Sequence, residues 1–319
     1  MRFETVRELA RSQSMDLPTT AQLKGMVQIQ EDEPLTFENF LSKFSTLRLF
    51  YRSPEIIKRI TRESIEDAAA DNIRYMELRF TPVALSRAQD FPLDKVMDWV
   101  IACAQQAEQE FGVKTRLIAS INRHESLALG AQVTYLAVER MQAGLVGIDI
   151  AGDEAGYSAE PFREIMDYAR NQGLHICIHA GEWNKGENVA QAIATLGAER
   201  IGHGIRVFDS PQAVELALQF NTTFEVCITS NFQSGAVASI ESHPVMRMIE
   251  AGLNVTLNTD DPSISNITLS DEYRLACEVL GLSVQSLRQK VLAAAEAAFL
   301  PNDERTALVA SIAAEFPSG

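Results

Sequence analysis

Residues 253–262 read LNVTLNTDDP, and this stretch separates the folds open to the chain. Polar and apolar residues alternate along it, so an extended backbone has one face of each kind. The apolar face holds Leu253, Val255 and Leu257, and the polar face holds Asn254, Thr256, Asn258 and Asp260. Such a strand fits a sheet with one solvated face. It also fits a barrel whose interior is polar and whose outer face packs on helices.

Further strand-like segments precede this stretch, and helical segments such as EPFREIMDYARNQG lie between them. The strand candidates are RYMELRFTP (74–82), KTRLIASIN (114–122), LVGIDIAG (145–152), LHICIHAGE (174–182), ERIGHG (199–204), TTFEVCITSN (222–231) and LNVTLNTDD (253–261). Repeated alternation of strand and helix predicts a parallel sheet in an α/β fold.

Two parallel architectures compete, an open doubly wound sheet and a closed barrel. No GxGxxG or GxxxxGK[ST] motif follows any strand, which removes the usual evidence for the open sheet. Polar residues stand instead where the strand candidates end, at Arg79, Asn122, Gly152, Asp153, His179, His203, Asn231 and Asp260. Barrel enzymes show this distribution, because the loops at one rim assemble the active site. We therefore predict a (β/α)8 TIM-type barrel. Only seven strands are found, so its first strand is expected to be missing.

The chain carries no low-complexity tract or Pro/Gly/Ser linker, which predicts a single domain over residues 1–319. Residues 1–70 read as helical, and the aromatic segment 35–44 is a candidate lid helix. The barrel is expected over 74–261 and further helices over 270–319.

The net charge of −15 argues against nucleic acid or an anionic membrane as a partner, since both require basic patches. The four cysteines are widely spaced with no CxxC pair, which predicts free thiols in a reducing compartment. No apolar run approaches 18 residues, and the N-terminal segment has charges throughout. These features predict a cytoplasmic protein with a small-molecule substrate.

Two histidines stand at strand ends. His179 in HICIHAGE is followed by Gly181 and Glu182, so the chain can turn tightly and direct a carboxylate over the same rim. The alternative is a buried histidine with a purely structural role, which we assign to His175, roughly 13 Å further down the strand. His203 in RIGHG lies between two glycines, which permit close backbone approach around a functional imidazole or form a surface turn.

The opening stretch adds Asp260, predicted to point into the barrel mouth, and Asp261 in the loop beyond it. Adjacent carboxylates before Pro262 also fit a plain helix cap with a surface charge. Imidazole and carboxylate donors on successive strand ends suit a catalytic Zn²⁺. A zinc ion with an open position activates water, and a nearby glutamate can shuttle protons. The combination predicts metal-assisted hydrolysis.

Several blocks resemble the signature motifs of the adenosine deaminase family of zinc amidohydrolases, in that family's order and over almost the whole chain. These blocks are ELRFTP (77–82), IDIAGDE (148–154), HAGE (179–182), RIGHG (200–204), LNTDDP (257–262) and FLPNDER (299–305), together with the aromatic helix LTFENFLSKF (35–44). The resemblance implies a purine nucleoside as the ligand and one Zn²⁺ per chain.

The resemblance also implies roles for matched positions. His179 and Asp260 correspond to zinc ligands, Glu182 to the acid that protonates purine N1, and His203 to the residue that orients the attacking hydroxide. Asp261 corresponds to a partner of N7 and the Gly152 amide to a partner of N3. Ser230 and Asn231 lie where the family carries pocket residues.

Members of the family begin with an HxHLDG strand that supplies two further zinc ligands, whereas this chain starts at the following helix. The zinc site is therefore expected to be incomplete. The leading prediction is deamination of adenosine or 2′-deoxyadenosine. Adenine deaminase, aminodeoxyfutalosine deaminase and a metal-free purine-binding protein stay open as alternatives.

Overall fold

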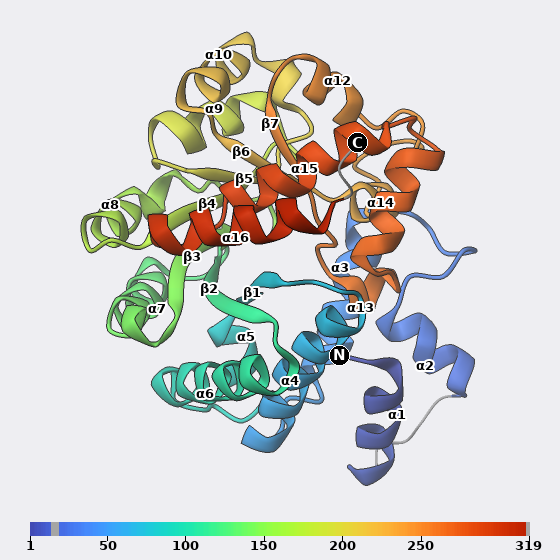
Figure 1. Cartoon of the computed structure of the whole chain (residues 1–319). Coiled ribbons are helices and arrows are strands. Elements are labelled where there is room, and N and C mark those ends of the chain that lie inside the picture. The colour runs from blue at the N-terminus through green and yellow to red at the C-terminus, as the bar shows by residue number, and fades with distance from the viewer. Residues whose placement is uncertain (14–18, 317–319) are drawn as a thin grey trace.

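The computed structural model describes residues 1–13 and 19–316; the remaining residues of the predicted helical segments 1–70 and 270–319 lie outside this range. Seven parallel strands form one sheet in chain order (Figure 1). They are β1 Tyr75–Phe80, β2 Lys114–Asn122, β3 Leu145–Ala151, β4 His175–Ala180, β5 Arg200–His203, β6 Thr223–Val226 and β7 Asn254–Leu257. Each strand pairs only with its neighbours in sequence, as successive βα units require.

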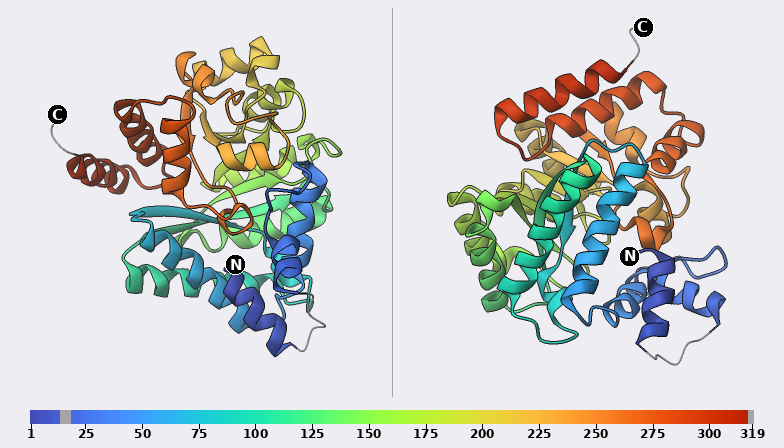
Figure 2. Two further views of the ribbon diagram at one scale, coloured as in Figure 1. Left: turned by 90° about the vertical axis from the view of Figure 1, so that its right-hand side faces the viewer. Right: turned by 60° about the horizontal axis from the view of Figure 1, so that its bottom comes forward.

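Helices surround the curled sheet, as the two views of Figure 2 show. The α-helices are α1 Phe3–Ser12, α2 Thr20–Val27, α3 Phe37–Arg48, α4 Pro54–Ala70, α5 Pro82–Ser86, α6 Leu93–Phe111, α7 Leu127–Val138, α8 Arg163–Asn171, α9 Gly186–Ala194, α10 Pro211–Phe220, α11 Ile228–Gln233, α12 Val245–Glu250, α13 Pro262–Ser265, α14 Leu269–Glu278, α15 Val284–Glu296 and α16 Asn302–Glu315. Short 3₁₀ turns are η1 Met141–Ala143, η2 Glu160–Phe162 and η3 Val207–Asp209.

The prediction of a TIM-type α/β fold with seven strands is confirmed. Within residues 1–13 and 19–316, no strand pairs with the outer edge of β1 or of β7. Alternation places residues such as Ile148, Ile150, Ile176 and Ile178 in the apolar layer between sheet and helices. The opposite face of the strands lines the interior of the curled sheet.

Charged side chains pair with one another in this interior. Arg79 contacts Glu225 at 2.7 Å and Asp149 at 3.4 Å, and Arg200 contacts Glu225 at 3.1 Å and also Glu77. The network explains why the inward face of the strands reads as polar in the sequence. A buried charge is tolerated only when it is paired in this way.

Two strand predictions extend furthest past the observed strand ends. The segment predicted as a strand over 222–231 turns helical at Ile228, where Glu272 accepts the backbone N–H groups of Ile228 and Thr229 at 2.8 and 3.1 Å. The stretch LNVTLNTDDP forms a strand only up to Leu257. Asp260 therefore lies in the turn after the strand, and strand alternation does not set its direction.

The N-terminal helices form a second apolar cluster beside the sheet. It contains Val6, Leu9, Leu23, Val27, Phe40, Leu47 and Phe50, together with Ile264 from α13. The four cysteines are free, as predicted. None of the helices in the described residues combines the length and apolar character that crossing a bilayer requires.

Candidate active site

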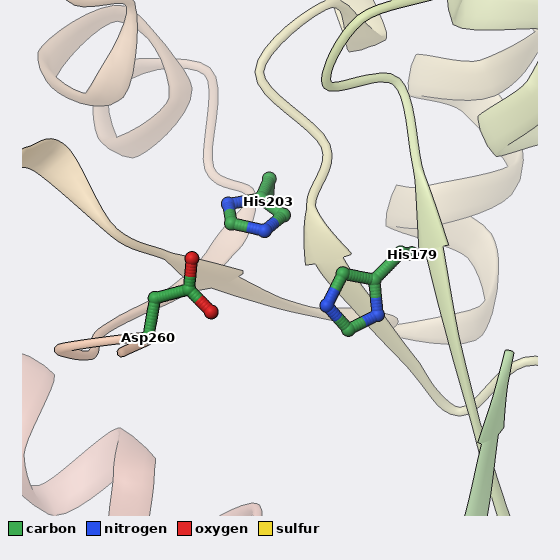
Figure 3. A group of neighbouring side chains, drawn as sticks. All are labelled: His179, His203 and Asp260. Carbon is green, nitrogen blue, oxygen red and sulfur yellow. The ribbon is translucent and has the colours of Figure 1, made fainter. Parts of the chain in front are cut away.

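Three predicted site residues converge at the carboxyl ends of the strands. Figure 3 shows the side chains of His179, His203 and Asp260 directed toward a common space. One nitrogen or oxygen atom from each lies within 4.8 Å of the others. The three come from the ends of β4 and β5 and from the turn after β7.

Asp149 and Gly202 together fix the position of the His179 ring. Its Nδ1 lies 3.0 Å from Oδ1 of Asp149, a fully buried residue of β3. Burial alone would raise the pKa of Asp149, but His179 and Arg79 outweigh it and hold the pKa at about 2. The carboxylate therefore accepts the Nδ1 hydrogen and leaves the Nε2 lone pair available for a metal. Gly202 makes room for the ring, since a Cβ there would lie 2.9 Å from the His179 imidazole.

His203 and Asp260 both have left-handed backbones, with φ of 61° and 56°. Non-glycine residues rarely adopt this conformation, and it is often found at functional sites. Ser230 donates a 2.7 Å hydrogen bond to Oδ2 of Asp260. Asp260 is exposed at the rim, and although partial desolvation of its carboxyl pushes its pKa upward, His203, Ser230 and His179 outweigh that effect and lower it. Asp260 is therefore poised as a carboxylate donor.

Glu182 is buried beside His203, with 3.4 Å between its Oε2 and Nε2 of His203. Desolvation raises the pKa of Glu182 well above its ordinary value, and the negative charges of Asp260 and Glu154 raise it further. Desolvation likewise lowers the pKa of His203 to about 4. The buried position thus favours a protonated carboxyl of Glu182 beside a neutral imidazole of His203.

A buried relay fixes the hydrogen atoms of this pair. The Val245 N–H donates to Nδ1 of His243 at 3.1 Å, so His243 carries its hydrogen on Nε2 and donates it to Oδ1 of Asn231 at 3.2 Å. The Asn231 amide nitrogen then faces Oε1 of Glu182 at 3.1 Å and Nδ1 of His203 at 3.0 Å. His203 accepts at Nδ1 and carries its hydrogen on Nε2.

Two of these residues were not predicted from the sequence. His243 is buried, with only 4% exposed, and supports Asn231. Nothing in SHPV signals that burial. Asp149 could have been noticed as a lone acid inside an apolar strand.

Two predicted substrate contacts lie at the same rim. Desolvation and the neighbouring Asp260 raise the pKa of Asp261 well above its ordinary value. Gly152 follows β3 with φ of 90°. His175, in contrast, stacks on Phe299 with 4.1 Å between ring centroids and bonds Glu199, away from the cluster. Its structural assignment agrees with this position.

The donor types of His179 and Asp260 fit zinc. Imidazole and carboxylate are ligand types of catalytic zinc sites, which typically use three protein donors. The sequence offered only His179 and Asp260 with His203 nearby. In the structure an atom of His203 lies within 4.8 Å of an atom of each of these two, but its Nδ1 accepts from Asn231 and its Nε2 carries the hydrogen, so neither nitrogen has a lone pair free for a metal.

A barrel-type sheet with such donors at its carboxyl rim is characteristic of metal-dependent hydrolases. The model of the family described as adenosine deaminase matches residues 1–315. An adenosine deaminase of Klebsiella pneumoniae subsp. pneumoniae is 35% identical over 315 residues, which cover 98% of this chain and 94% of that protein. The chain belongs to the adenosine deaminase family.

Solved structures agree with this assignment. An adenine deaminase from Arthrobacter aurescens superposes with a TM-score of 0.87 at 25% identity, covering 98% of this chain and 94% of that one. Arabidopsis ADAL in complex with GMP gives 0.88 at 27% identity, with 99% and 94% covered. A zinc-bound amidohydrolase from Burkholderia ambifaria gives 0.89 at 25% identity, with 99% and 86% covered.

Proposed function

We propose that the chain catalyses the hydrolytic deamination of adenosine or 2′-deoxyadenosine, giving inosine or 2′-deoxyinosine and ammonia. The observation that carries the proposal is the buried pair of Glu182 and His203 beside the His179 and Asp260 donors. Membership of the adenosine deaminase family supports the same reaction class.

One zinc ion per chain would be held by His179 and Asp260, with His203 beside them as a hydrogen-bond donor. The zinc-bound Burkholderia ambifaria neighbour supports this metal. The chemistry that zinc supplies when bound is Lewis acidity, which makes water a better nucleophile at neutral pH.

Glu182 would supply the proton that the reaction needs at purine N1. Adding a proton to N1 withdraws electrons from C6 and prepares that carbon for attack by water. A carboxyl group can donate there only if it holds its proton near neutral pH, and the raised pKa of Glu182 supports this role. Ammonia then leaves C6 as the carbonyl of inosine forms.

Hydrogen bonds from the chain would orient the other reacting groups. His203, with its hydrogen on Nε2, can donate to the attacking oxygen. Purine N7 carries a lone pair and no hydrogen, so Asp261 must donate to it in its protonated form, which its raised pKa favours. The Gly152 amide is proposed to donate to N3.

Helix α3 is proposed as the lid over the sugar side of the pocket. The Phe37 ring packs on Trp183, the residue after Glu182, with 4.2 Å between centroids. An aromatic cover next to the proton donor favours a nucleoside over the free base. Adenine and a purine nucleotide are the competing substrates, since the similar solved structures include an adenine deaminase and a GMP complex.

The test uses the chain supplied with zinc and follows the loss of adenosine absorbance near 265 nm, with adenine, 2′-deoxyadenosine, aminodeoxyfutalosine and AMP assayed in parallel. We expect selective but slow turnover of the two nucleosides, because His179 and Asp260 offer two metal donors where a catalytic zinc typically has three. Glu182→Gln should abolish turnover and keep the zinc content of the parent, because it removes a proton and no ligand. Zinc content is measured by atomic emission on the same samples.

Selective turnover of adenine, aminodeoxyfutalosine or AMP would replace the nucleoside by that substrate. Stoichiometric adenosine binding with no turnover of any compound would establish the purine-binding alternative. A Glu182→Gln variant that deaminates at the parental rate would remove the proposed proton donor.

A further inference from the structure

The turn after β4 carries Glu182, and one buried carboxylate binds its backbone. Glu154, from the loop after β3, is 3% exposed. It accepts backbone N–H groups from four consecutive residues, at 2.6 Å from Gly181, 2.9 Å from Glu182, 3.1 Å from Trp183 and 3.3 Å from Asn184. The Asn188 side chain adds a fifth bond at 2.9 Å.

The five hydrogen bonds are distributed over the two carboxylate oxygens of Glu154. Oε1 accepts from Gly181 and Asn188, whereas Oε2 accepts from Glu182, Trp183 and Asn184. No ion pair of Glu154 occurs among the described residues, so dipoles of N–H groups stabilise its charge. Such charge-assisted bonds are roughly twice as strong as neutral ones.

The same turn is held from its other side by two arginines. Arg123 donates from its guanidinium to the carbonyl oxygen of His179. The Arg206 amide donates to the carbonyl of Gly181 at 2.9 Å, and its Nε donates to that of Glu182 at 3.0 Å. The two arginines therefore bind the carbonyl groups of the turn, and Glu154 binds its N–H groups.

The turn needs these external bonds because its own conformation is unusual. Gly181 has φ of 69°, and a Cβ there would lie 2.6 Å from a methyl carbon of Val189. Between Gly181 and Asn184 the chain forms neither helix nor strand, so no regular ladder pairs these four N–H groups. Glu154 replaces that ladder.

We propose that Glu154 is a positioning residue, which fixes the Glu182 carboxyl against the substrate by binding the backbone amides of its turn. This deepens the proposed function, on which the role of Glu182 rests. Glu154 touches no reacting atom. A shift of about 1 Å in a reacting group costs about 100-fold in rate, so fixing this turn bears directly on turnover.

The test variant is Glu154→Gln. In either orientation of the amide, one oxygen is replaced by an NH₂ group that cannot accept from the backbone. Hydrogen–deuterium exchange measured by mass spectrometry should therefore accelerate about tenfold over residues 181–184. In the deaminase assay kcat should fall about 100-fold with KM within about twofold of the parent. Glu154→Asp, which keeps two acceptors on a shorter stem, should recover part of both losses.

Glu108→Gln is the matched control. Like Glu154, Glu108 accepts a backbone N–H, that of Thr115 at 2.9 Å. Thr115 lies at the start of β2 and therefore at the opposite end of the sheet. The Glu108→Gln variant should keep hydrogen–deuterium exchange over residues 181–184 and kcat at parental values. The exchange readout needs no activity, so absence of turnover in the parent would refute the proposed function and still leave Glu154 testable.

Parental exchange over 181–184 in Glu154→Gln would overturn the proposal. So would accelerated exchange with unchanged kcat, or a kcat loss matched by Glu108→Gln. If Glu154→Gln does not fold, Glu154→Asp decides by the same readouts, and parental exchange and kcat in that variant would equally overturn it.

Discussion

At the scale of single residues, Asn231 sets the protonation pattern of the site. Its side-chain amide bonds both Glu182 and His203, and only one orientation of the amide serves them. His243 selects that orientation by donating to Oδ1. A histidine remote from the metal donors thereby decides which nitrogen of His203 carries a hydrogen.

His243→Ala should consequently lower kcat. Without the His243 donor, the Asn231 amide can rotate and present oxygen to Glu182 and His203. We expect about a tenfold decrease, because supporting hydrogen bonds around metal sites are worth about 10–100-fold, with zinc content unchanged. Steady-state kinetics and metal analysis measure both. His124→Ala, on an exposed loop, is the control and should behave as the parent.

The same histidine predicts a pH dependence of stability. Desolvation lowers the pKa of folded His243 to about 4, against about 6.5 in the unfolded chain. Between these values the unfolded state binds the extra proton, so this contribution is complete above pH 6.5 and is lost as pH falls toward 4. The free energy of unfolding of the parent should drop relative to His243→Ala by about 2 kcal/mol from pH 7 to 4.5.

Urea unfolding of chelator-treated protein at several pH values supplies that comparison. The difference between parent and variant removes the contribution of the other titrating groups. A difference that stays constant from pH 7 to 4.5 would contradict a buried neutral His243.

At the scale of elements, the pairing of β4 with β5 forms the metal-binding part of the site. The register sets His179 opposite Gly202, and the imidazole occupies the space that a side chain on β5 would fill. The ring is thereby kept against Asp149 of β3. Three adjacent strands cooperate in orienting one donor.

Gly202→Ala should therefore weaken zinc binding. The added methyl group displaces the His179 ring from Asp149, and loss of such support costs about 10–100-fold in metal affinity. Competition with a chromophoric chelator measures the affinity. Gly281→Ala is the control, because it introduces strain at φ of 75° with no atom within 4 Å of the new Cβ. It should cost stability and leave zinc affinity at the parental value.

How far the elements could be predicted depends on whether their signals are local. Strand–helix alternation and polar strand ends are local, and they led to the sheet order and to His179, Glu182, His203 and Asp260. The end of β6 was misjudged because Glu272, 44 residues away from Ile228, binds the amides that begin α11. His243 was not predicted for the same reason. Its burial depends on tertiary contacts and is not signalled by the residues next to it in the sequence.

At the scale of the whole molecule, the charged interior connects the sheet to the C-terminal segment. Arg200 of β5 pairs with Glu77 of β1 and Glu225 of β6, and its guanidinium lies 3.5 Å from the centroid of the Phe299 ring. Strands distant in sequence and the segment before α16 thus depend on one cation.

Arg200→Met should destabilise the fold strongly, because it leaves the buried Glu77 carboxylate without a counter-charge and Glu225 with Arg79 alone. Breaking a buried pair on one side costs about 3–5 kcal/mol. Arg74→Met, which removes the exposed pair with Glu315, should cost at most about 1 kcal/mol. Urea unfolding midpoints of the two variants provide the test. Equal midpoints would show that the interior network contributes no more than a surface pair.

The position of Ile264 in the N-terminal apolar cluster has a consequence for synthesis of the chain. Helices α1–α3 pack on this residue, and the Ile29 N–H bonds its carbonyl at 3.0 Å. A ribosome adding about 5–20 residues per second needs roughly 10–50 s to travel from Ile29 to Ile264. The strands can pair successively during that interval, because each one joins its predecessor. Helices α1–α3 meanwhile lack Ile264, so the apolar face that this residue covers is where we expect chaperones to bind.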